Sequence, residues 1–120
     1  MPLPPIDEAY LQEILVDLLK IPSPTGFTER VIAHTEQLMG VYPTLKLFRT
    51  RKGALVAEWP GKSEVAPRAL TAHADTLGAM VKEIKSNGRL KLTKIGGFAW
   101  NTVEGEGCTV FTRGSEEVRG

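Results

Sequence analysis

Residues 69–75, Ala-Leu-Thr-Ala-His-Ala-Asp, lie between two different sequence patterns. The apolar run 69–72 shows no alternation of apolar and polar residues, which is typical of a strand covered on both faces. Ahead of it, apolar residues recur at helical spacing. After it come short strand-like runs separated by glycine-containing turns. Helices that precede a strand of this kind favour a layered α/β fold.

Two helices are expected in the first part of the chain. Asp7 can cap the first helix, and Pro22 ends it because the residue before a proline avoids helical angles. Thr28 can cap the second helix, and Gly40 is a candidate for its end. Two short strands are predicted to follow, at residues 45–49 and 54–59.

The part after Asp75 is predicted to consist of short strands. Apolar runs at residues 80–84 and 90–95, on both sides of Ser86-Asn87-Gly88, predict a β-hairpin. A two-residue loop would set Ile84 opposite Lys91, whereas a three-residue loop sets Ile84 opposite Leu90. The three-residue loop is favoured because it places apolar side chains on a common face. Further strands are predicted at residues 108–112 and 117–120, with a turn at residues 113–115 between them.

These later strands have no helix to cover them. The sequence also reaches Gly120 as a strand begins, which would leave unpaired strand edges. We therefore expect the chain to be the front of a longer protein.

The composition excludes several classes of protein. A length of 120 residues allows one small domain or a piece of a larger one. Fifteen basic and fourteen acidic residues give a net charge of +1, which excludes a strong general field for nucleic acid or an acidic membrane. Cys108 is the single cysteine, so neither an internal disulfide nor a Cys-rich zinc module can form. With no secretory signal and no apolar run near the ~20 residues of a membrane span, a cytoplasmic protein is expected.

The residues best suited to chemistry are His73 and Asp75. Residues two apart on an extended segment point the same way, so one can bind a metal while the other supports it. A histidine ligand commonly donates its second ring N–H to a carboxylate, which fixes its tautomer and orientation. From these residues alone, a buried histidine that is hydrogen-bonded to a nearby aspartate remains the alternative.

The wider sequence resembles a known enzyme family. Residues 70–81, Leu-Thr-Ala-His-Ala-Asp-Thr-Leu-Gly-Ala-Met-Val, resemble the first metal-ligand segment of the TET-type metallo-aminopeptidases. This family includes glutamyl, leucyl, lysyl and deblocking aminopeptidases, and some relatives are catalogued as endoglucanases. Ala54 departs from the pattern, because Asn is common there. The similarity extends, in order along the chain, to residues 18–26, 50–53, 94–97 and 106–110.

The resemblance implies a fold and an activity. Residues 1–76 would be the front of a zinc-peptidase-like mixed α/β catalytic domain, and residues 77–120 the beginning of a β-barrel dimerisation subdomain. The parent would be a hydrolase that removes amino-terminal residues from peptides. It would use two divalent metal ions, zinc or cobalt, that activate a bridging water. His73 would be a metal ligand, and Asp75 the catalytic residue that orients it.

The same resemblance implies the partners of the parent protein and the inactivity of these 120 residues on their own. Partners would be peptide substrates and further copies of the chain, since the family forms dimers that build a dodecamer. Nucleic acid and membrane are not expected as partners. The family's other metal ligands and its general base, a glutamate, lie beyond the β-barrel insertion and thus after residue 120. The 120 residues alone are therefore expected to be inactive.

Other residues fit structural roles better than chemical ones. His34 is expected to be partly buried or on the surface, and Cys108 to be a small buried hydrophobe. A metal site built from these two residues together with His73 and Asp75 has no tight ligand spacing to support it. A basic cluster at residues 46–52 is interpreted as a solvated face. The acidic pairs, interpreted as turn residues rather than a glycosidase pair, are Glu104 with Glu106 and Glu116 with Glu117.

Two alternatives to the leading interpretation stay open. One is a non-catalytic binding or assembly module that uses the β segment as an interaction surface. The other is a different di-zinc exopeptidase family. Its usual pattern continues from His-x-Asp into Val-Val-Pro, whereas Thr76-Leu77-Gly78 follows here.

Overall fold

The computed structural model describes residues 5–114 and 116–120. These residues form two α-helices and three two-stranded antiparallel sheets, with the strands paired β1–β2, β3–β4 and β5–β6. The elements are α1 (Glu8–Lys20), α2 (Glu29–Gly40), β1 (Lys46–Arg49), β2 (Leu55–Glu58), β3 (Gly78–Ile84), β4 (Leu90–Ile95), a 3₁₀ turn η1 (Trp100–Thr102), β5 (Thr109–Phe111) and β6 (Glu117–Arg119). Helices combined with small sheets are compatible with the predicted α/β class.

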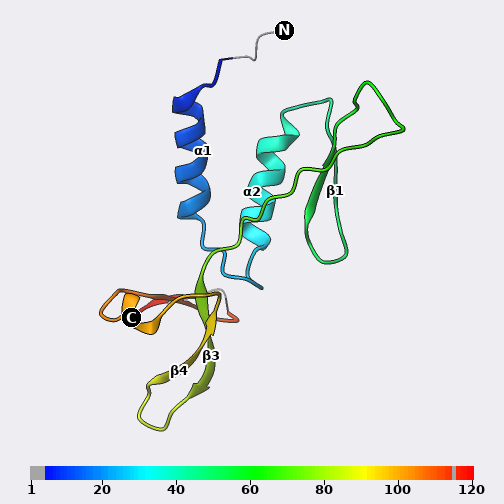
Figure 1. The fold of residues 1–120 in the computed structure, drawn as a ribbon. Coiled ribbons are helices and arrows are strands. Elements are labelled where there is room, and N and C mark those ends of the chain that lie inside the picture. Colours follow the sequence, from blue (N-terminus) through cyan, green and yellow to red (C-terminus); the bar gives the residue numbers. More distant parts are fainter. Residues whose placement is uncertain (1–4, 115) are drawn as a thin grey trace.

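The arrangement of these elements is elongated. Figure 1 shows the helices and the β1–β2 hairpin at one end, and β3 to β6 at the other. The radius of gyration is 18.8 Å, against about 14 Å for a compact domain of this length. The accessible surface is 10876 Å², whereas a compact protein of this mass exposes about 6,400 Å². Among the described residues, Val31 is the one fully buried apolar side chain.

Helix α1 begins and ends where the sequence predicts. The Asp7 carboxylate accepts a hydrogen bond from the Tyr10 N–H at 3.0 Å, which caps the helix. Its last turn closes with the Ile21 N–H donating to the Leu18 carbonyl at 3.2 Å, immediately before Pro22. The helix is amphipathic, yet it buries no side chain. Its apolar stripe is therefore only partly covered within residues 5–114 and 116–120, with Ile14 and Leu18 half-buried.

Helix α2 packs against β1 and β2. Val31 provides the buried contact of this helix, and Arg49 of β1 forms ion pairs with Glu29 and Glu36 on its surface. Thr28 lies at the predicted cap position, but its side chain makes no capping hydrogen bond. Gly40 is the final helical residue, so the predicted end is correct to within one position.

The predicted strand at residues 69–72 is wrong. Residues 59–75 contain neither helix nor strand, and Leu70 is fully exposed. A strand that is buried on both faces needs neighbours to pair with and layers to cover it. Within the described parts of the chain, residues 69–75 find neither. The first β-bridge after this segment comes at Thr76, which pairs in parallel with Pro24.

The β3–β4 hairpin has the predicted register. Ile84 lies opposite Leu90, as a three-residue loop requires. The Lys85 N–H donates to the Arg89 carbonyl at 2.9 Å and closes that loop. Gly88 has a φ of +79°, a left-handed conformation that favours glycine. Strand β3 begins at Gly78, two residues earlier than predicted, and a bulge interrupts its register after Val81.

The β5–β6 hairpin packs against the loop that precedes α2. Phe111 stacks on Phe27 with ring centroids 4.9 Å apart. Arg30 of α2 pairs with Glu117 of β6 at 3.1 Å. Cys108 is exposed, so its predicted burial is wrong; a two-stranded ribbon has no second layer to cover it. The predicted turn at residues 113–115 includes Ser115, which lies outside the described residues.

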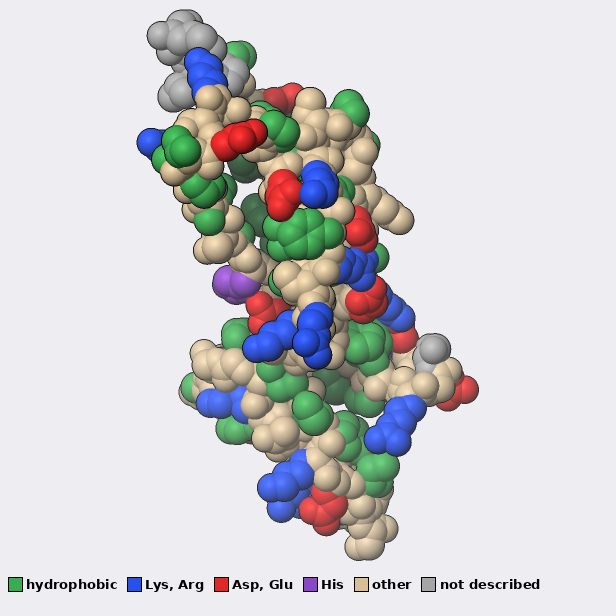
Figure 2. Space-filling view, turned by 90° about the vertical axis from the view of Figure 1, so that its right-hand side faces the viewer, with side chains coloured by type: hydrophobic (Ala, Val, Ile, Leu, Met, Phe, Trp, Pro, Cys, Tyr) green, Lys and Arg blue, Asp and Glu red, His purple; other side chains and the backbone are tan. Residues whose placement is uncertain are grey.

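Apolar side chains are widely exposed. Figure 2 shows them spread over both the helical end and the β end of one face. The two strands of the β3–β4 hairpin are exposed at every position except Gly78 and Ile95. No helix in the described part of the chain is long and apolar enough to cross a membrane.

Candidate functional site

The loop after α1 meets the segment that carries the predicted site residues. The Ser23 hydroxyl donates to the Ala74 carbonyl at 2.9 Å. In return, the Thr76 N–H donates to the Ser23 carbonyl at 2.8 Å. Ser23 is fully buried by this junction. Two segments that are about fifty positions apart in sequence are thereby fixed against each other.

Glycines permit this close approach. A Cβ atom added to Gly78 would lie 2.6 Å from the Cβ atom of Pro24, a distance that real side chains do not adopt. On the other side of the junction, Gly26 has a φ of +92°, which turns the loop away directly after Thr25. A side chain at position 78 would push the segment around Asp75 away from the loop, and one at position 26 would strain the backbone of the turn.

His73 and Asp75 contact each other as the sequence predicts. The Nδ1 atom of His73 lies 3.1 Å from Oδ1 of Asp75 and 3.2 Å from the Asp75 backbone carbonyl oxygen. Because a carbonyl oxygen only accepts hydrogen bonds, Nδ1 carries the proton in this geometry. In a neutral ring with the proton on Nδ1, Nε2 is the nitrogen that can bind a metal. The side chain of His73 is 84% exposed, so the alternative of a buried histidine is wrong.

Asp75 has a second partner that the sequence did not indicate. The Thr25 hydroxyl donates to Oδ2 of Asp75 at 2.5 Å. This hydrogen bond is the main reason why the pKa of Asp75 lies below its usual value. Partial burial opposes the shift, and the neighbouring His73 adds to it. The result is a chain of contacts, Thr25 to Asp75 to His73, with the charged carboxylate in the middle.

This arrangement fits one metal ligand and its support. A catalytic zinc usually has three protein ligands and a water. No group of three or more His, Cys, Asp or Glu side chains suited to a metal occurs in residues 5–114 and 116–120. The hypothetical site of His34, His73, Asp75 and Cys108 is therefore wrong. His34 is partly buried on α2, as predicted, and its Nε2 atom is buried without a hydrogen-bond partner.

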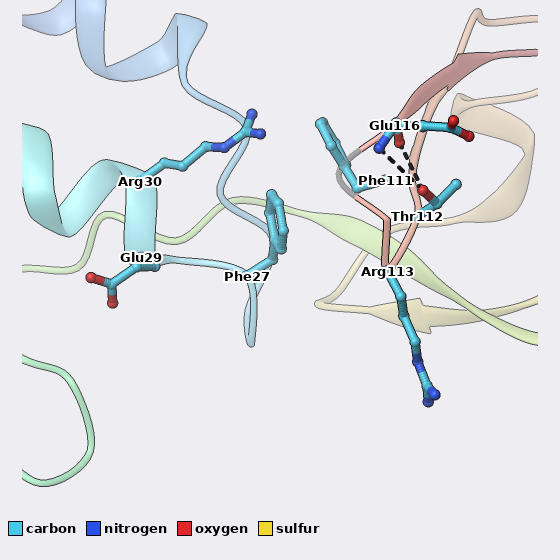
Figure 3. Close-up of a pocket in the computed structure, with 7 residues that line it drawn as sticks. All are labelled: Phe27, Glu29, Arg30, Phe111, Thr112, Arg113 and Glu116. Atoms are coloured by element: carbon cyan, nitrogen blue, oxygen red, sulfur yellow. Dashed lines mark hydrogen bonds between the residues drawn. The ribbon is translucent and has the colours of Figure 1, made fainter.

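Two cavities adjoin the site and the β5–β6 hairpin. The cavity of about 440 Å³ in Figure 3 lies between the start of α2 and the β5–β6 turn. There Arg30 extends toward Phe27 and Phe111, 5.6 Å from each ring centroid. A wider, mainly apolar cavity of about 750 Å³ has Thr25 and Thr76 on its wall, beside Asp75. Apolar space thus opens next to the two threonines that flank Asp75.

Comparison with known proteins identifies the family. Residues 53–120 match the model of the M42 glutamyl aminopeptidase family. The chain belongs to the M42 family. It is also 47% identical over 108 residues, 90% of its length, to a Bacillus subtilis (strain 168) protein named "Putative aminopeptidase YhfE". It is 34% identical over 67 residues, 55% of its length, to the glutamyl aminopeptidase of Lactococcus lactis subsp. cremoris (strain MG1363).

The M42 chain is short compared with these relatives. It spans 31% of the length of the Bacillus protein and 19% of the length of the Lactococcus enzyme. The span matched by the family model includes His73 and Asp75. Thr25 lies ahead of that span. The expected membership of this aminopeptidase family is confirmed.

Sequence reasoning missed the role of Ser23 and Thr25 in the M42 chain. Both lie in a Ser-Pro-Thr-Gly segment that the sequence marks as a loop. Loop residues of this type commonly bond to nearby backbone, and no local pattern shows that their partners are Ala74 and Asp75. The available signal was the polar loop itself, since both polar side chains are short and lie beside glycine or proline.

Proposed function

We infer that this chain supplies the amino-terminal part of an aminopeptidase whose activity depends on two divalent metal ions, zinc or cobalt. One observation carries the proposal: Nδ1 of His73 lies within hydrogen-bond distance of Asp75, so that Nε2 is the ring nitrogen left for a metal. A bound divalent metal supplies a water acidic enough to act as nucleophile near neutral pH. His73 would hold one metal, and Asp75 would orient the imidazole. Peptides with a free amino terminus would be the substrates.

The proposal extends to domains and assembly. Residues 1–76 would be the front of the catalytic α/β domain, and residues 77–120 the start of a β-barrel subdomain that pairs copies into dimers and then a dodecamer. The exposed β3–β4 hairpin supports this assignment, because an uncovered two-stranded sheet is only marginally stable. Cytoplasmic residence is part of the same proposal.

The 120 residues alone would not hydrolyse peptides. Catalysis by a bound metal requires a fixed set of ligands, and proton transfer requires a positioned group such as a glutamate. The described residues bring together one imidazole and one carboxylate. The other function that this structure favours is a non-catalytic assembly module, because the apolar side chains of the hairpin are available for a partner.

The test compares the 120-residue chain with the product of the complete reading frame that encodes it. Release of a chromogenic amine from a panel of amino-acid derivatives is measured with added zinc or cobalt. The complete protein should be active and lose activity to a chelator, whereas the short chain should be inactive. An inactive complete protein, across the panel and with both metals, would favour the assembly module. Metal-dependent turnover by the short chain would contradict the inactivity of the fragment.

Substitutions in the complete protein test the site itself. His73→Ala should remove metal and activity together. Asp75→Asn keeps the shape but not the charge, and should cost about 10–100-fold in metal affinity or rate. His34→Ala removes the other imidazole of residues 1–120 and should change neither metal content nor rate. Full metal content and full rate in His73→Ala would refute the metal site.

A further inference from the structure

We propose that Thr25 is a positioning residue for His73, acting through Asp75 to select the ring tautomer that leaves Nε2 free. The proposal rests on the function inferred above for His73. It adds a residue from the loop after α1, which lies outside the segment matched by the family model.

The Asp75 carboxylate is shared between Thr25 and His73. Oδ2 accepts the Thr25 hydroxyl at 2.5 Å, and Oδ1 faces Nδ1 of His73 at 3.1 Å. A hydroxyl donating to a carboxylate forms one of the shorter and stronger hydrogen bonds in proteins, at about 2.5–2.7 Å. With one oxygen held in this way, rotation of the carboxylate is restricted. The other oxygen is then kept in front of Nδ1.

The loop that carries Thr25 is itself held by contacts on both sides of this residue. Two hydrogen bonds through Ser23 flank the contact, one to the Ala74 carbonyl and one from the Thr76 N–H. The bridge between Pro24 and Thr76 fixes the register of the two segments. Gly78 allows its segment to lie close to Pro24, since a Cβ atom there would be 2.6 Å from the Cβ atom of Pro24. These contacts therefore hold the Thr25 hydroxyl within hydrogen-bond distance of Asp75.

The third argument is that His73 needs external positioning. Its side chain is largely exposed, and neighbouring side chains do not pack around the ring to orient it. A neutral imidazole can carry its proton on either nitrogen, and the hydrogen bond at one nitrogen decides which. Among residues 5–114 and 116–120, the acceptors at Nδ1 are the carboxylate and the backbone carbonyl of Asp75. Losing the Thr25 hydroxyl would free the carboxylate to rotate, and only the longer contact to the backbone carbonyl, at 3.2 Å, would then favour the proton on Nδ1.

The experiment reads the tautomer directly in the metal-free 120-residue chain. Two-bond ¹H–¹⁵N correlations distinguish the tautomers of neutral histidine rings, at a pH well above the ordinary histidine pKa of about 6.5. The chain has two histidines, so His34 serves as an internal reference. The unmutated chain should show His73 protonated at Nδ1. Protonation of His73 mainly at Nε2 in the unmutated chain would overturn the proposal without any variant.

Three variants identify the group that is responsible. Thr25→Val keeps the shape without the hydroxyl, and should raise the Nε2-protonated fraction of His73 several-fold. Thr25→Ser keeps the hydroxyl and should restore the original tautomer. If Thr25→Val also alters the His34 signals, Thr25→Ala replaces it in the comparison with Thr25→Ser. A His73 tautomer that is the same with and without the hydroxyl would refute the role of Thr25.

A second measurement separates this proposal from the proposed function. In the complete protein, Thr25→Val should weaken zinc affinity by about 10–100-fold, as changes around a ligating histidine typically do, with Thr25→Ser near the original value. Unchanged zinc affinity in Thr25→Val would contradict the positioning role. A complete protein that binds zinc but has no peptidase activity would refute the proposed function, and the tautomer result would stand.

Discussion

The α2–β1–β2 region and the β3–β4 hairpin are equally regular in their backbones but differ in what covers them. In the first region, Val31 is fully buried and Arg49 joins the strand to the helix. In the second, nearly every residue of both strands is exposed. The comparison teaches that strand pairing and burial have separate causes. Pairing follows from the turn and the local register, whereas burial requires a second layer.

The largest expected effect concerns association of the uncovered region. The isolated chain should self-associate or remain bound to another polypeptide, because the accessible surface greatly exceeds that of a compact protein. Ile84 and Leu90 lie opposite each other on the hairpin. Burying two such side chains contributes about 3–6 kcal/mol, so replacing both with Thr should weaken association by more than tenfold. Analytical ultracentrifugation over a concentration series measures this shift.

The control for this prediction is Lys91→Thr, next to Leu90 on the same strand. It changes β4 without removing apolar surface, and should leave association within about twofold of the original. A compact monomer that unfolds cooperatively at high dilution would contradict the prediction, and would show that the hairpin needs no cover.

The second prediction compares one valine from each region. Val31→Ala removes a fully buried side chain from the α2 interface and should destabilise it by about 2 kcal/mol. Val81→Ala, in the uncovered hairpin, should cost less than about 0.5 kcal/mol. Native-state hydrogen exchange of the α2 and β3 amides measures both changes. Equal losses of stability for Val31→Ala and Val81→Ala would contradict the difference in burial between the two regions, because the hairpin would then have a buried face.

Sequence reasoning succeeded where local rules decide the structure. Asp7 and Pro22 set the limits of α1 through capping and backbone sterics. The opposition of Ile84 and Leu90 follows from loop length and a shared apolar face. The contact of His73 with Asp75 follows from their separation by two positions. Each of these features depends on residues that are close together in sequence.

Prediction from the sequence failed where burial or a hydrogen-bond partner depends on residues far apart in the chain. The run at residues 69–72 has the composition of a buried strand, but composition carries no information on whether neighbouring strands are present. Cys108 was expected to be buried from its place on a predicted strand, and it is exposed because no side chain of the described residues covers that end of the ribbon. The bond from Thr25 to Asp75 joins residues 50 positions apart, so no periodicity reveals it. What a sequence pattern predicts is an apolar face or a polar loop, not its partner.

The smallest expected effect concerns two cations on the same strand, β1. Arg49, with 29% of its side chain exposed, donates from two nitrogens to one oxygen of Glu36 and also pairs with Glu29. Lys46 pairs with Glu58 at 3.3 Å on the exposed part of the β1–β2 hairpin. Arg49→Met should destabilise the α2–β1 contact more than Lys46→Met does, and the Lys46 change should cost less than about 0.5 kcal/mol.

Both substitutions keep an apolar stem of similar length, so each one mainly removes a charge. The difference between their effects then reports how strongly each ion pair is shielded from solvent. Urea unfolding followed by hydrogen exchange in α2 measures each change, because urea does not screen ion pairs. Repeating the measurement in about 1 M salt, where the Debye length falls to about 3 Å, should remove the Lys46 effect and keep most of the Arg49 effect. That outcome is expected because Arg49 is partly shielded between helix and strand. If salt removed both effects equally, the stability of the α2–β1–β2 region would come from Val31 and its apolar neighbours. The ion pairs of Arg49 would then contribute little to it.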